Sequence, residues 1–94
     1  QQPLGKYGML RLHFLQAHRP VLYNELLLSG KLVPHLHEID VTCIQRLELL
    51  IPQMMALEGV DEELKARDQM EWVARMNNIK ACIEELLLAE LIYN

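Results

Sequence analysis

Apolar residues recur every three or four positions over a long central stretch of this sequence. These steps put the side chains on one face of an α-helix, whereas a half-buried strand would alternate strictly. A helix of this length gains most of its stability by packing that face on another element. We therefore predict a long helix over Pro34–Glu58 within a helical core. The stripe consists of Leu36, Ile39, Cys43, Leu47, Leu50, Met54 and Leu57.

A second long helix is predicted over Asp68–Tyr93. Asp68 stands three residues before Glu71, which is the spacing of a capping box with Asp in place of Ser or Thr. Asp61 begins a short helical turn before it, and Gly59 ends the preceding helix. The apolar stripe of the second long helix consists of Trp72, Val73, Met76, Ile79, Ile83, Leu86 and Leu87.

Two shorter helices are predicted in the N-terminal third. One runs from about Gly5 to His18, with Tyr7, Leu10, Phe14 and Ala17 on one face. The next runs over Pro20–Ser29, because proline suits the first turn of a helix and Gly30 can end it with a positive φ. That helix is apolar on nearly all sides, so we expect it to lie inside the bundle.

Pro52 lies inside the third predicted helix. Proline removes one backbone hydrogen bond and clashes with the preceding turn, so we expect a kink near Glu48–Pro52 or two abutting helices. No segment shows strand-like alternation. The fold class is therefore all-α: a small bundle of four to five helices with two long antiparallel helices.

The length of 94 residues suits a single helical domain over residues 1–94. The chain begins with Gln1 rather than methionine. We therefore expect the full-length protein to carry a further N-terminal segment.

Charge is divided unevenly along the chain. Residues 1–37 contain four Lys/Arg, all four histidines and one acid, a net +3, whereas residues 38–94 have a net charge of −7. A basic segment of this kind favours contact with DNA phosphates, although a solvated helix face has the same composition. The candidate DNA-phosphate contacts are Lys6, Arg11, His13, His18, Arg19 and Lys31.

The Gly30-Lys31 pair raises two further interpretations. A phosphate-binding loop would need glycine at position 25 and Ser or Thr at position 32, where Glu25 and Leu32 stand. A helix-turn-helix, with one helix over Pro20–Ser29, a turn that contains glycine and a second helix from Pro34, has a suitable layout and stays open. Glu38 and Asp40 argue against it, because exposed carboxylates would approach the DNA backbone unfavourably.

The sequence offers little for catalysis, so we predict no enzymatic activity, no catalytic residue and no small-molecule substrate. The two Ser/Thr hydroxyls have no evident His–Asp partners, and the neighbouring acids Glu84 and Glu85 diverge by about 100° around a helix. A zinc site from His35, His37 and Cys43 would lack the paired C-x-x-C spacing, and we predict no metal or other cofactor. We expect both cysteines, Cys43 and Cys82, to be buried, reduced thiols.

The last predicted helix carries more leucine than one stripe needs. Leu88, Leu91 and Ile92 are therefore a candidate partner surface for a second subunit. They could equally cover the first helix, which is the interpretation we favour. No apolar run is long enough to cross a membrane and no signal peptide is present, so we expect a cytoplasmic protein without a membrane partner.

Three segments together resemble a known family. They are GKYGMLRLHFLQAHRPVLYNELLLSGKLVPHLHEID (5–40), GVDEELKARDQMEWVARMNNI (59–79) and EELLLAELIYN (84–94). In order and spacing they resemble the TnpV family of transposon-encoded proteins.

The resemblance implies a helical, non-secreted protein from a bacterial mobile element and supplies no catalytic residue. We expect a non-enzymatic accessory protein that binds DNA, the transposon recombinase, or both. The alternative is a helical homo-oligomeric protein-interaction module, such as a homodimer, with no DNA contact.

Overall fold

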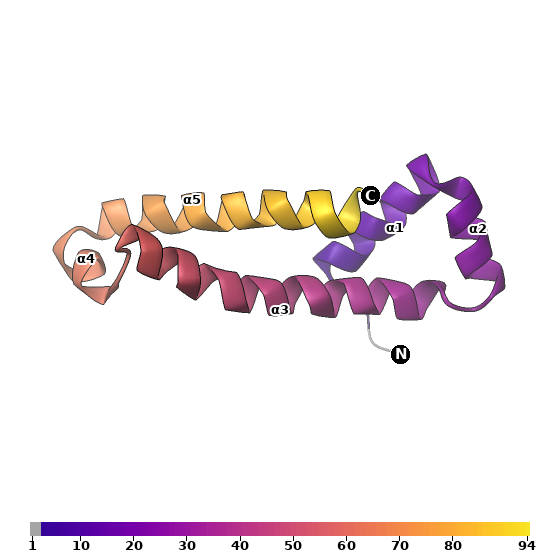
Figure 1. Cartoon of the computed structure of the whole chain (residues 1–94), viewed down its shortest axis with the longest axis horizontal. Coiled ribbons are helices and arrows are strands. Elements are labelled where there is room, and N and C mark those ends of the chain that lie inside the picture. Colours follow the sequence, from indigo (N-terminus) through magenta and orange to yellow (C-terminus); the bar gives the residue numbers. More distant parts are fainter. Residues whose placement is uncertain (1–2) are drawn as a thin grey trace.

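α3 (Leu32–Glu58) and α5 (Gln69–Leu87) lie side by side and antiparallel, and they form the frame of the molecule (Figure 1). The computed structural model describes residues 3–94, in which every regular element is helical. α1 (Lys6–His18) and α2 (Pro20–Leu28) lie at one end of the frame, and α4 (Glu62–Arg67) lies at the other (Figure 1). A π-helical turn, η1 (Leu88–Ile92), continues α5. The prediction of an all-α bundle with two long antiparallel helices is confirmed.

Most of the predicted helix ends are confirmed because they depend on local chemistry, but α3 begins at Leu32 rather than at the predicted Pro34. The Asp61 side chain accepts a hydrogen bond from the Leu64 N–H at 2.8 Å, and Asp68 accepts one from the Glu71 N–H at 3.1 Å. Each carboxylate thus satisfies an N–H that the first turn of its helix leaves free. Gly30 and Gly59 have φ of 76° and 67°, a conformation that costs glycine little.

α3 runs without interruption through Pro52, so the alternative of two abutting helices is wrong. Its ribbon changes direction between its two halves, as a helix with an internal proline does (Figure 1). Pro52 and Glu48 are both exposed. Proline has no N–H to donate to the Glu48 carbonyl oxygen. This carbonyl is therefore on the side of the helix that faces water.

The core is divided into three clusters along the molecule. The first joins α4 and α5 to the second half of α3, the second joins α1, α3 and η1, and the third joins α1 to the start of α3. Their buried apolar residues are Val60, Leu64, Met76, Ile79, Ile83 and Leu87; Tyr7, Cys43 and Ile92; and Leu15, Leu32 and Leu36.

Two predictions of burial are wrong. α2 has no buried residue, and Val21 and Leu28 are 71% and 87% exposed. The helix packs on α1 and α3 through half-buried Leu22 and Leu26, and no other element covers its remaining sides. Cys43 is buried as expected, but Cys82 on α5 is exposed.

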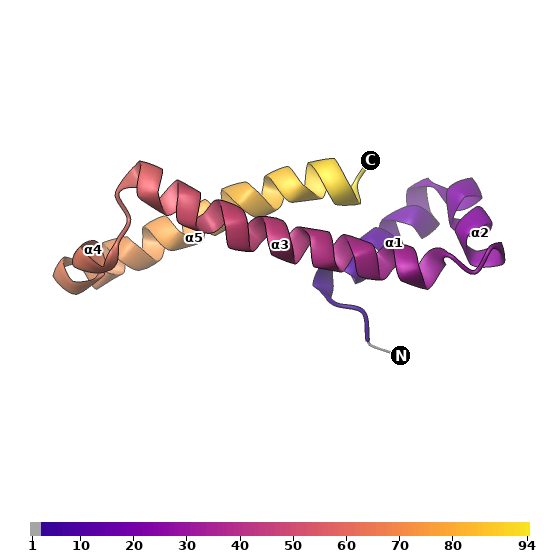
Figure 2. The same cartoon turned by 60° about the horizontal axis from the view of Figure 1, so that its bottom comes forward.

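The molecule is long and thin, with principal extents of 55 × 26 × 18 Å. Its radius of gyration is 16.8 Å, whereas a compact domain of this length has about 12 Å. Figure 2 shows the reason: beyond the reach of α1, α3 and α5 form a layer only two helices wide. None of the helices within residues 3–94 has the length and apolarity to span a membrane.

Candidate functional site

The Asp40 carboxylate joins α3 to the N-terminus of α1. Its oxygens accept hydrogen bonds from the backbone N–H of Gly5 and of Gly8, each at 2.7 Å. Both glycines allow this approach, because a Cβ on Gly8 would lie 2.5 Å from Asp40 Oδ2 and 3.0 Å from the Leu36 carbonyl oxygen. Asp40 is buried, so it caps α1 from a distance of 32 residues in sequence. The two glycines of the GKYG segment were the signal for this contact.

Arg11 is only 5% exposed, and its guanidinium binds the C-terminal segment. Nη1 donates to the Ile92 carbonyl oxygen at 2.8 Å and to Asn94 Oδ1 at 3.0 Å. Burial, followed by the nearby Arg19 charge, lowers the pKa of Arg11, although guanidinium stays charged in proteins. Because its N–H groups are used inside the molecule, Arg11 is not available as the DNA-phosphate contact that the sequence suggested.

His35 on α3 completes this buried contact. Arg11 Nε donates to His35 Nε2 at 3.3 Å, so this ring nitrogen is an acceptor and the imidazole is neutral. Burial lowers the pKa of His35 most, and the Arg11 charge lowers it further. We refer to Asp40, Arg11 and His35 with their partners as the polar clamp.

Lys6 and Tyr7 attach the first turn of α1 to α5. Lys6 Nζ and Tyr7 Oη both donate to Glu84 Oε2 at 2.9 Å. These hydrogen bonds lower the pKa of the Glu84 carboxyl, and burial together with the Glu84 bond raises the pKa of Tyr7 to about 12. Lys6 is largely exposed, but part of its charge is compensated by Glu84.

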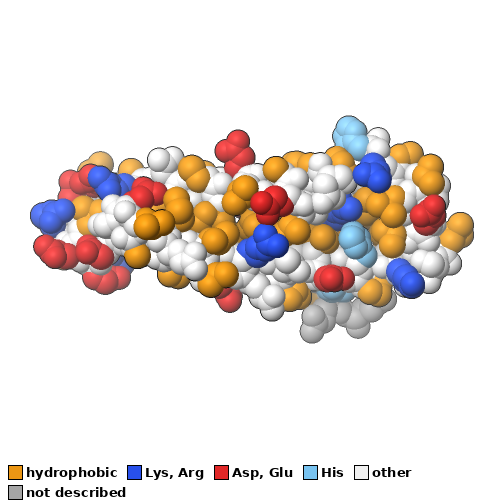
Figure 3. Space-filling view, in the orientation of Figure 1, with side chains coloured by type: hydrophobic (Ala, Val, Ile, Leu, Met, Phe, Trp, Pro, Cys, Tyr) orange, Lys and Arg blue, Asp and Glu red, His pale blue; other side chains and the backbone are white. Residues whose placement is uncertain are grey.

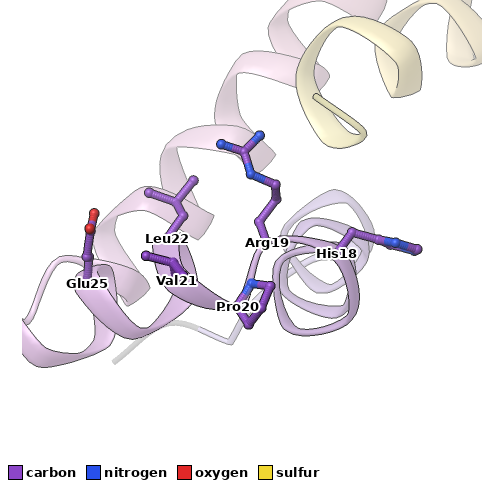
Figure 4. Close-up of a pocket in the computed structure, with 6 residues that line it drawn as sticks. All are labelled: His18, Arg19, Pro20, Val21, Leu22 and Glu25. Atoms are coloured by element: carbon purple, nitrogen blue, oxygen red, sulfur yellow. The ribbon is translucent and has the colours of Figure 1, made fainter.

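The four remaining candidate contacts are all exposed and lie at the same end of the molecule. His18 and Arg19 border a depression of about 360 Å³ between α1 and α2 (Figure 4). Arg19 also donates to the Asn94 carbonyl oxygen at 3.1 Å. His13 and His18 border a second depression, of about 440 Å³, beside Phe14 and Tyr93. Lys31 lies in the turn before α3.

The depression in Figure 4 does not bring an acid and a base together. His18 and Arg19 point to different sides, and Glu25 lies beyond Val21 and Leu22. Such an arrangement suits contact with a surface better than proton transfer, which requires groups within hydrogen-bond reach of one substrate.

The set His35, His37 and Cys43, which the sequence did not favour as zinc ligands, is not arranged as a metal site. Within residues 3–94 no three His, Cys, Asp or Glu side chains are arranged to hold a metal ion. His35 binds Arg11, while Cys43 is fully buried in the cluster with Tyr7 and Ile92. Burial, with the Asp40 charge, raises the pKa of the Cys43 thiol, which disfavours the thiolate that a metal requires.

The start of α3 lacks the side chains that usually contact the edges of DNA bases. The first turns of α3, residues 32–42, contain no Arg, Lys, Asn or Gln, the side chains that usually contact base edges. Asp40 points inward and would not repel phosphates, but Glu38 is exposed. A contact at this end would therefore involve the DNA backbone.

The three apolar residues suggested as a partner surface pack inside the molecule. Ile92 is fully buried, and half-buried Leu88 and Leu91 pack against the cluster that contains Tyr7 and Cys43. They cover α1, as the favoured interpretation had it, and Ile92 offers no surface to a partner.

Sequence reasoning missed a different apolar surface. A depression of about 330 Å³ follows the contact between α3 and α5, and we call it the hairpin groove. The signal in the sequence was the width of the apolar stripes, which carry more apolar residues than the contact between two helices can bury. Leu57 and Leu86 accordingly remain exposed. The groove is lined by Leu50, Met54, Cys82, Ile83 and Leu86.

Comparison with known proteins identifies the family. Searches of curated proteins and of solved structures gave no match. The family model for transposon-encoded protein TnpV matches residues 1–92, which is nearly the whole chain. The order and spacing of the three segments noted in the sequence agree with this match. The chain therefore belongs to the TnpV family of transposon-encoded proteins.

Proposed function

We propose that this protein is a non-enzymatic, cytoplasmic accessory protein of a bacterial transposon that binds DNA through its basic end. The basic end is the part of the molecule formed by residues 3–39. It contains four Lys/Arg and two acids, with Glu84 of α5 bound to its Lys6, whereas residues 58–75 at the α4 end contain six acids and three Lys/Arg. This separation of charge along a 55 Å molecule is the observation that carries the proposal. It orients the basic end toward a polyanion.

The contact would be small and would involve phosphates. Arg11 is internal and Lys6 is paired with Glu84, so Arg19 and Lys31 are the principal cations, with His13 and His18 beside them. Each phosphate that the protein neutralises adds about −0.9 to the slope of a plot of log K for binding against log salt concentration. We therefore expect a slope of about −2 to −4 and little preference for sequence.

Fluorescence anisotropy with a labelled duplex from the transposon end, at about 50 and 200 mM salt, tests this proposal. The double variant Arg19→Gln/Lys31→Gln is expected to reduce the salt slope by about 2. The matched control, Lys65→Gln/Arg67→Gln, removes the same charge from the exposed α4 end and should leave the slope unchanged. No binding at low salt, or equal losses in both variants, would contradict the proposal.

A second candidate is binding to the recombinase encoded by the same transposon. The exposed apolar side chains of α2, led by Val21 and Leu28, favour a protein partner at this end. Leu28→Gln should weaken capture of the purified recombinase, whereas Met70→Gln, an equally exposed residue near the α4 end, should not. The remaining alternative, a homo-oligomeric module without DNA contact, predicts self-association and no salt-dependent binding.

A further inference from the structure

We propose that the hairpin groove is the interface for a second copy of this chain, which lies antiparallel to the first and completes a four-helix bundle. The inference does not rest on the proposed DNA contact, because none of the candidate phosphate contacts lines the groove. Figure 3 shows many hydrophobic side chains on the surface of the middle of the molecule, with a few charged groups among them.

The monomer exposes more surface than a compact protein of its mass, and a second copy would cover the difference. The chain exposes 6450 Å², whereas a compact monomer of 11.0 kDa exposes about 5,600 Å². The difference, roughly 800 Å², is the area that each partner buries in a protein–protein interface of standard size. A dimer through the groove would thus bring the exposed area per chain to the value expected for its mass.

The architecture of the middle of the molecule indicates what shape of partner fits. Here α3 and α5 form a single layer, and α1 reaches α5 only near the end where Tyr7 binds Glu84. The lining of the groove is almost entirely apolar, and Leu57, seven residues beyond Leu50, extends the same stripe. A second layer of two helices would cover this stripe as the helices of a four-helix bundle cover one another.

The charges of the two ends select the antiparallel orientation. Residues 3–39 have an excess of Lys/Arg, and residues 58–75 have an excess of acids. An antiparallel partner places its acidic end beside the basic end of the first copy, at both ends of the dimer. A parallel partner would place like charges together, which costs binding energy.

The antiparallel arrangement places Cys82 near the twofold axis. Leu50 and Cys82 line the groove, one from each helix, and a twofold axis through the groove would pass near both. Cys82 would therefore lie close to Cys82 of the partner subunit. Since Cys43 is fully buried, Cys82 is the accessible thiol of the two in the chain and serves as a natural probe.

Sedimentation velocity from low micromolar to about 100 μM protein tests the dimer. A mass near twice 11.0 kDa is expected for the wild type. Leu86→Glu puts a charge into the groove and should raise the dimer Kd by at least about 30-fold. Val41→Glu is the matched control, because Val41 is 53% exposed against 50% for Leu86 and lies on the opposite side of α3 from Leu50. Circular dichroism should show both variants to be helical.

Cross-linking with a short bis-maleimide tests whether the two hairpin grooves face each other. The wild type should give a covalent dimer through Cys82, and Leu86→Glu should give little. A wild type that stays monomeric, or equal weakening by Leu86→Glu and Val41→Glu, would overturn the interface. A dimer whose Cys82 reacts with N-ethylmaleimide yet gives no covalent dimer with the bis-maleimide would overturn the hairpin groove as the interface.

Discussion

The two halves of the frame are held together in different ways. At the basic end, α1, the start of α3 and the C-terminal segment are joined by the polar clamp of Asp40, Arg11 and His35. In the half that carries α4, α3 packs on α5 chiefly through apolar residues such as Met54 and Ile83. The charged residues that suggest ligand binding in the sequence are thus partly used to hold helices together. The apolar residues that suggest an ordinary core remain partly exposed and form the hairpin groove.

The largest expected effect on stability comes from removing the Asp40 carboxylate from the polar clamp. Asp40→Ala leaves the Gly5 and Gly8 N–H groups without their acceptor, at a cost of about 3 to 4 kcal/mol in the free energy of unfolding. Urea denaturation measures the loss. Glu38→Ala, at an exposed position two residues away, should change stability by less than about 0.5 kcal/mol. Equal effects would show that Asp40 is not a structural cap.

Removing the buried guanidinium should have the next largest effect. Arg11→Met keeps much of the volume but removes the donors to the Ile92 carbonyl and the Asn94 side chain, so we expect a loss of about 2 to 3 kcal/mol. Arg19→Met removes one exposed hydrogen bond and should cost less than about 1 kcal/mol. Thermal and urea denaturation of the two variants give the comparison. A harmless Arg11→Met would mean that the C-terminal segment does not need this contact.

Most helix boundaries and the caps could be predicted from the sequence, whereas the polar clamp could not. Asp61, Asp68, Gly30 and Gly59 act on residues within one turn, so spacing alone locates them. Arg11 binds residues 81 and 83 positions away, and no local pattern marks such a pair. α2 was misjudged for the same reason: its composition shows that it is apolar, but only the tertiary arrangement shows that little covers it.

A smaller effect is expected where α1 meets α5. Tyr7→Phe removes the hydroxyl that donates to Glu84 and should reduce the free energy of unfolding by about 1 kcal/mol. The ring itself, buried against Cys43 and Ile92, is retained. Tyr23→Phe is the control, because the Tyr23 hydroxyl accepts an exposed hydrogen bond from Gln16 Nε2. Equal free energies of unfolding for the two variants, measured by denaturation, would contradict a stabilising role for the Tyr7–Glu84 hydrogen bond.

The smallest effect concerns pH and the neutral histidine of the polar clamp. Burial and Arg11 lower the pKa of His35 below its ordinary value of about 6.5. As pH falls from 7 through 6.5, the unfolded chain therefore takes up this proton before the folded chain does. Stability should decrease over this window and level off below the folded pKa.

The histidine responsible can be identified by substitution. His35→Gln should reduce the loss of stability between pH 7 and 5, because the titrating group is removed while the glutamine carbonyl can still accept from Arg11. His13→Gln, at an exposed position, should leave the wild-type profile unchanged. Unfolding measured at several pH values decides between them, and superimposable profiles for wild type and His35→Gln would exclude His35 as the source.

The binding of Arg11 and Arg19 to residues 92 and 94 has a consequence for biosynthesis. The helices made first cannot complete these contacts until residues 92 and 94 have left the ribosome, so docking of α1 on the C-terminal segment must follow synthesis of α5, although α1 can pack on α3 earlier. During that interval the unpaired arginines and the apolar sides of α1 and α2 remain open to other molecules. Nascent chains of this protein should therefore depend on chaperones more than a helical chain of this size with only local contacts would.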